Sequence, residues 1–137
     1  MVVSVYSLEP TVWIRQAARN LGHLTRHIRH NHKAKEVVIR YIVTVRGKLK
    51  GSKAAAQKVH DATVAAISPK GRSMGSTAHQ PFLNTQDEGE FLAVDSWDNL
   101  EGIQQLFSDP NLAAEFAKLF EGQPEVTIWA QSGWMEY

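Results

Sequence analysis

His60 is the first candidate for chemistry, because a titratable ring interrupts an otherwise apolar stripe. In the segment KAAAQKVHDATVAAI, residues 53–67, helical spacing puts His60 on the same side as three apolar residues, Ala56, Val64 and Ile67. Burial could keep such an imidazole neutral and ready to act as a general base. The position also suits a histidine hydrogen-bonded within a core or a dimer interface, and both interpretations stay open.

Further polar candidates lie on the predicted strands. His79 is an equal alternative to His60 as a base, and the following Pro81 places its strand near a sheet edge. Asp95 precedes Trp97 by two residues, so the two share a strand face. Arg40, on the first predicted strand, could pair with Asp95. A structural salt bridge and a catalytic pair both fit this pattern.

Three aromatic residues could form the wall of a pocket for a planar ligand: Phe91, Trp97 and Trp129. They could equally be core residues. The stretch HLTRHIRHNH, residues 23–32, brings a different kind of candidate, since His23, His27 and His30 are spaced to share a helix face. That run contains no Asp, Glu or Cys to complete a metal site, so we expect a solvated or interface helix face without a metal.

Composition limits the classes of protein to consider. The 137 residues suffice for one continuous core. Lys and Arg number 15 and Asp and Glu number 14, so the net charge of +1 favours neither a nucleic acid nor a membrane surface as partner. The chain has no cysteine. Charged residues interrupt the first apolar segment, so we expect neither signal peptide nor membrane span, and a cytoplasmic location.

The pattern predicts an α+β domain at 36–137, preceded by an amphipathic helical extension at 1–35. Within the domain we expect a strand at 36–46, a helix capped by Ser52 that stops before Pro69, and two strands joined through NTQDEG. Asp98 with Glu101 has the spacing of a capping box, Asp109 caps a second short helix, and EVTIWAQSGW forms the last strand.

The resulting order is β-α-β-β-α-α-β, a ferredoxin-like antiparallel sheet with helices on one face. Apolar residues occupy both sides of the strands, since Phe91 and Trp97 lie opposite Leu92 and Val94. One helical layer covers only one face. A large exposed apolar patch is rare, so the other face must meet the N-terminal helix, a ligand or another subunit. Of these we expect a second subunit and hence a homodimer.

EFLAVDSWDNLEGIQQLFSDPNLAAEF followed by PEVTIWAQSGW resembles the dimeric α/β barrel superfamily, especially antibiotic biosynthesis monooxygenase-type domains. The likeness covers residues 36 to about 134. It implies two ferredoxin-like sheets brought together in a homodimer, with a pocket between the sheet and the helices of each subunit. Members include cofactor-free oxygenases acting on phenolic polyketides, haem-degrading enzymes, isomerases, cyclases and proteins of unknown activity. The fold therefore does not fix the function.

The haem-degrading branch carries a haem-ligating histidine on the later helical segment, whereas residues 99–120 here contain none. Cofactor-free oxygenation needs a pocket, a base and donors for developing negative charge. We therefore expect a protein without a cofactor that binds a small apolar or aromatic ligand. The specific hypothesis is a cofactor-independent monooxygenase for an aromatic or polyketide-like substrate. The alternative is a non-catalytic ligand-binding or stress-associated protein of the same fold.

The expected site residues fall into two groups, and of all of them only Trp97 matches a position of the family. The catalytic candidates are His60, His79 and Asp95, and the substrate-binding candidates are Arg40, Phe91, Trp97 and Trp129.

Overall fold

The structure is a computed structural model that describes residues 39–137. The predicted helix within residues 1–35 and its histidine-rich stretch lie outside the described residues. The prediction that those histidines bind no metal therefore stays a prediction.

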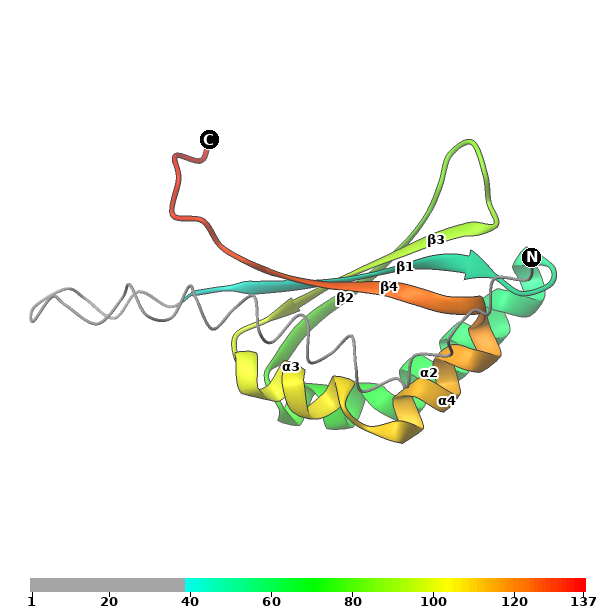
Figure 1. Ribbon diagram of the computed structural model, residues 1–137, viewed down its shortest axis with the longest axis horizontal. Helices are drawn as coiled ribbons and strands as arrows, with labels where there is room; N and C mark the ends of the chain where they lie inside the picture. Colours follow the sequence, from blue (N-terminus) through cyan, green and yellow to red (C-terminus); the bar gives the residue numbers. More distant parts are fainter. Residues whose placement is uncertain (1–38) are drawn as a thin grey trace, which may run out of the picture. The chain divides into compact units, whose positions relative to one another are not determined.

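The described elements follow the predicted order. They are β1 (Tyr41–Leu49), α2 (Lys53–Ser73), β2 (Ser76–Leu83), β3 (Glu90–Trp97), α3 (Leu100–Phe107), α4 (Pro110–Leu119) and β4 (Phe120–Ala130). The four strands form one sheet in the order β2-β3-β1-β4, and every neighbouring pair is antiparallel. Figure 1 shows the three helices on one side of this sheet. The ferredoxin-like α+β prediction is confirmed for this part of the chain.

A polar residue precedes each helix, and its side chain accepts a hydrogen bond from a free backbone N–H group of the first turn. Ser52 Oγ accepts from the backbone of Ala55 at the start of α2, and Asp109 accepts from Asn111 at the start of α4, both as predicted. The prediction of a capping box at Asp98 is wrong. Asn99 caps α3 instead, while the backbone N–H of Asp98 donates to the carbonyl of Gly75.

Helix α2 runs through Pro69 to Ser73, further than predicted. Proline costs a helix one backbone hydrogen bond, but contacts made by the last turn favour its continuation. Gly71 is buried close to Leu106 of α3, and Lys70 binds the Asp109 carboxylate at 2.5 Å. Tertiary packing thus overrides the local signal.

Strand β1 continues to Leu49, three residues beyond the predicted end at residue 46. Gly47 permits this, because a Cβ there would lie 2.7 Å from the Phe120 ring. The ring occupies the space that a side chain would take. Pairing of Leu49 with Phe120 also starts β4 directly after α4, five residues earlier than the predicted strand.

The core lies between the helices and the face of the sheet that carries Val43, Val45, Phe91, Ala93 and Trp97, all buried. Leu92 and Val94 alternate with these residues and are half-buried on the opposite face, as predicted. Within residues 39–137, no helix is both long and apolar enough to cross a membrane.

Candidate functional site

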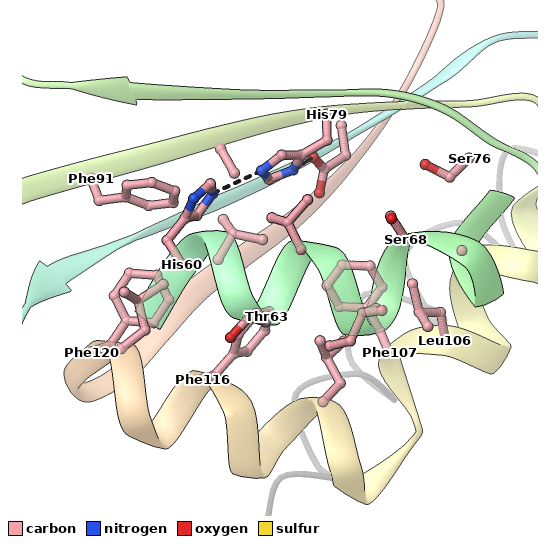
Figure 2. Close-up of a pocket in the computed structure, with 18 of the residues that line it drawn as sticks. His60, Thr63, Ser68, Ser76, His79, Phe91, Leu106, Phe107, Phe116 and Phe120 are labelled. Carbon is pink, nitrogen blue, oxygen red and sulfur yellow. Dashed lines mark hydrogen bonds and ion pairs between the residues drawn. The ribbon is translucent and has the colours of Figure 1, made fainter. Parts of the chain in front are cut away.

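A cavity of about 120 Å³ lies between the helices and the sheet. Most of its wall is apolar, with side chains from β1, α2, β3, α3, α4 and the start of β4. His60, His79 and Asp95 also line it, as do Phe91 and Trp97. The structure thus brings five of the seven predicted site residues to one cavity. Figure 2 shows the two histidine rings side by side at the cavity wall, His60 from α2 and His79 from β2.

The two histidine rings are in direct contact. Their centroids lie 5.2 Å apart with an interplanar angle of 25°, and the two Nε2 atoms are separated by 3.0 Å. On the other side of the His79 ring, Nδ1 lies 2.5 Å from Asp95 Oδ1. This Asp–His pair exists because the register of β2 with β3 places His79 directly opposite Asp95.

Asp61 extends this contact chain at its other end. Its Oδ1 lies 2.9 Å from Nδ1 of His60. The Asp61 side chain is 63% exposed, whereas those of His60 and Asp95 are each 15% exposed. Asp95, His79, His60 and Asp61 therefore form a continuous polar chain from the cavity wall to solvent, which we call the His-Asp chain.

Sequence reasoning did not identify Asp61. Consecutive helical residues point about 100° apart, so the residue after His60 is expected to face away from the cavity. The pairing of adjacent side chains depends on rotamers that helical periodicity does not give. Its one signal in the sequence is adjacency to a histidine on an apolar stripe.

Trp97, which lines the cavity, has a buried hydrogen-bond donor. The side chain is buried at 3% exposure, and its indole Nε1–H has no hydrogen-bond partner among residues 39–137. A buried unpaired donor is uncommon, because it has lost its bond to water without a replacement. An oxygen of a bound molecule could supply the missing acceptor.

Two predicted substrate-binding residues lie away from the cavity. Trp129 pairs with Ile42 in the sheet, which puts its side chain on the face opposite the cavity, where Nε1 donates to Thr44 Oγ1 at 2.9 Å. Arg40 precedes β1, is exposed and does not line the cavity. Asp95 binds His79, and no ion pair joins it to Arg40 among the described residues. Arg40 and Trp129 therefore do not line this cavity, and a substrate-binding role for them stays a prediction.

A second hollow, of about 200 Å³, lies beside the first one. His60 and Phe91 line both hollows, with their rings 5.5 Å apart at the centroids. These two side chains therefore form the wall between the hollows. Lys53 and Asp61 bring charge to the second hollow, and Lys53 is paired with Glu88 at 3.2 Å.

One carboxylate near the cavity is committed to structural contacts. Glu115 on α4 accepts hydrogen bonds from Lys118 and from Thr63, a residue of the cavity wall, and these two bonds lower the pKa of Glu115. Within residues 39–137 no three His, Cys, Asp or Glu side chains converge as metal ligands do. The His-Asp chain is extended rather than convergent.

Comparison with known proteins shows the fold. No family model and no curated protein matches the sequence. Among solved structures, SnoaB of Streptomyces nogalater, a cofactor-independent oxygenase, is 10% identical with a TM-score of 0.54, covering 73% of this chain and 97% of its own. The ActVA-Orf6 monooxygenase of Streptomyces coelicolor, in complex with nanaomycin D, is 16% identical with a TM-score of 0.55, covering 72% and 93%.

The same fold also occurs in the NE2512 protein of Nitrosomonas europaea, whose function is unknown; it is 17% identical with a TM-score of 0.51, covering 73% of this chain and 96% of its own. The resemblance to antibiotic biosynthesis monooxygenase-type proteins is thus confirmed at the level of fold. This chain shares its fold both with cofactor-independent oxygenases and with a protein of unknown function.

Proposed function

We propose that this protein binds a small aromatic molecule with an acidic hydroxyl group in the 120 Å³ cavity and oxidises it with dioxygen without a cofactor. The observation that carries the proposal is that one cavity is lined both by an oriented base and by a residue with an unpaired buried donor. The base is His79, held by Asp95, and the donor is the indole N–H of Trp97.

The cavity size supports a single aromatic ring as the minimal ligand. An apolar cavity of ~150 Å³ is known to accept benzene. The rest of the wall supplies the apolar surface that such a ring needs, including Leu106, Phe107 and Phe116 (Figure 2). A fused-ring molecule such as 1-naphthol is larger than this minimal ligand and would extend into the neighbouring hollow, which only His60 and Phe91 separate from the cavity.

The chemistry requires one proton transfer before dioxygen reacts. The imidazole pair takes the hydroxyl proton of the phenol, and Trp97 Nε1–H donates to the phenolate oxygen. The electron-rich ring carbon forms a bond with dioxygen, the O–O bond breaks, and the second oxygen leaves as water with the two displaced hydrogens. A phenol and dioxygen thus give a quinone and water. The substrate supplies every electron, so the reaction needs no other reductant.

Binding and dioxygen uptake with 1-naphthol test this proposal. We expect saturable binding and uptake of one dioxygen for each quinone formed. Trp97→Phe should weaken 1-naphthol binding by roughly fivefold, the effect of one hydrogen bond of ~1 kcal/mol. It should leave the binding of naphthalene, which has no hydroxyl group, unchanged. Trp129→Phe, on the other face of the sheet, is the matched control and should change neither.

The catalytic part is tested separately with His79→Gln and His60→Ala. Each should lower the turnover by about 100-fold or more, the usual contribution of a general base, with much of the 1-naphthol binding retained. Failure to bind either probe would overturn the proposed site. Binding without dioxygen uptake would favour the alternative of a non-catalytic ligand-binding protein.

Residues on the face of the sheet opposite the helices support a homodimer, which we propose as the assembly. Leu92 and Val94 of β3 are half-buried there, and Trp129 is 55% exposed. Apolar groups gathered on one face are what a subunit interface would cover.

A further inference from the structure

We propose that His60 and His79 act as one proton acceptor, with a single proton shared between their Nε2 atoms and Asp61 and Asp95 holding the two rings in place. Asp61 is then a positioning residue for this acceptor. The use of this acceptor on a phenol rests on the function proposed above, whereas the sharing of the proton does not.

Counting protons along the His-Asp chain leads to this proposal. The chain has three contacts, at 2.5, 3.0 and 2.9 Å, and each needs one proton between its two heavy atoms. Ionised carboxylates bring no proton, and each neutral imidazole brings one. Two neutral rings therefore supply two protons for three contacts. The chain is complete only when the pair of rings carries one proton more.

The carboxylates decide which contact lacks its proton. A hydrogen bond from an imidazole N–H to a carboxylate is charge-assisted and stronger than one between two neutral rings. Nδ1–H of His79 therefore donates to Asp95, and Nδ1–H of His60 donates to Asp61. Both Nε2 lone pairs then point at each other across 3.0 Å. A proton placed between them turns this repulsive contact into a hydrogen bond.

The negative charge around the two histidine rings favours a ligand with a neutral hydroxyl group. Asp61 on α2 and Asp95 on β3 contribute two negative charges, so the chain has a net charge of −1 even with the shared proton. Neither neighbouring charged residue offsets this negative charge. Glu115 of α4, which accepts a hydrogen bond from Thr63, is itself an acid, and the positive charge of Lys53 on α2 is paired with Glu88.

The remaining walls are electrically neutral, because β1, α3 and β4 contribute only apolar side chains to the cavity. A carboxylate ligand would be repelled by the negative charge of the chain, whereas a phenol can enter neutral and transfer its proton. The inference therefore narrows the substrate class to neutral hydroxyl-bearing aromatic molecules.

The first experiment follows the imidazole nitrogens of the whole, ligand-free protein by ¹⁵N NMR across a pH titration. His60→Gln and His79→Gln spectra assign the two rings among the six histidines of the chain. We expect three protons on the four ring nitrogens of the pair below the transition. As the pH rises, one proton should leave in a single step that both rings report. Two rings that titrate independently would overturn the proposal.

Asp61→Asn gives the sharper test. An asparagine amide can donate to a bare Nδ1 of His60, so the chain with two neutral rings becomes complete and the third proton is no longer needed. The transition should move to lower pH, because the variant also removes one nearby negative charge that favours the shared proton. Glu121→Gln, which removes an exposed carboxylate that lines neither hollow, should leave it in place. An unchanged transition in Asp61→Asn would overturn the role of Asp61.

Ligand class is tested by comparing 1-naphthol with 1-naphthoate in calorimetry above the transition. We expect 1-naphthol to bind at least tenfold more tightly. Equal or tighter binding of 1-naphthoate would overturn the neutral-ligand inference. Since the NMR measurement needs no ligand, a shared proton in a protein that does not consume dioxygen would separate failure of the proposed function from failure of this inference.

Discussion

Gly102 of α3 lies against the backbone of Met74 at the end of α2, so that a Cβ at position 102 would be 1.8 Å from the Met74 carbonyl oxygen. No side chain fits at this contact without movement of the backbone. The close approach joins the two helices next to the cavity residues Leu106 and Phe107. Gly102 thus sets the distance between α3 and α2.

We expect Gly102→Ala to destabilise the fold by about 3 kcal/mol or more, because the added methyl group must displace backbone rather than a flexible side chain. Urea unfolding followed by circular dichroism measures this. Gln105→Ala, at an exposed position of the same helix, is the control and should change the free energy of unfolding by less than about 0.5 kcal/mol. Equal stability of the two variants would show that the helices can separate without cost.

Acid should weaken the contact between Asp109 and Lys70. The hydrogen bond from Lys70 is the main cause that lowers the pKa of Asp109, and the backbone N–H of Asn111 adds to it. Because the pKa is lower in the folded than in the unfolded protein, ionised Asp109 stabilises the fold above the unfolded value. That contribution disappears as the pH falls through the lower, folded value.

Asp109→Asn keeps a side chain that can cap α4 and removes only the charge. The variant should therefore be less stable than the wild type at pH 6, and the difference should shrink at about pH 3, below the ordinary aspartate value. Urea midpoints at the two pH values measure this. Lys70→Gln should behave in the same way. A stability difference that stays constant with pH would show that the Asp109 charge makes no contribution.

Leu92 lies on the face of the sheet opposite the helices, which we propose as the homodimer interface. Wild-type protein at micromolar concentration should have twice the mass of the chain by light scattering. Leu92→Lys should shift it to monomer, because a buried unpaired ammonium group is costly. Ala114→Lys, at an exposed position of α4, should remain a dimer. A wild-type monomer would contradict the proposed assembly.

The sequence alone determined the order and type of the described elements, because these depend on local periodicity and on capping residues such as Ser52 and Asp109. Alternation within strands also placed Phe91 and Trp97 on the face opposite Leu92 and Val94. Local patterns indicated that His60 interrupts an apolar stripe. These features depend on residues within a few positions of one another.

Tertiary structure decided the contacts between segments. Strand register placed His79 opposite Asp95, and it turned Trp129 to the face away from the cavity by pairing it with Ile42. A shift by one residue would exchange the two faces of a strand, so periodicity alone cannot tell which face meets the helices. Asp61 belongs to the site because its side-chain rotamer brings the carboxylate to Nδ1 of His60.

Contacts between distant segments also explain why two predicted boundaries, the ends of α2 and β1, were wrong. Helix α2 passes Pro69 because its last turn packs against α3, and β1 passes Gly47 because the Phe120 ring fills the place of a side chain. In both cases the energy of packing exceeds the local preference of proline or glycine. Only the folded chain brings these distant residues together.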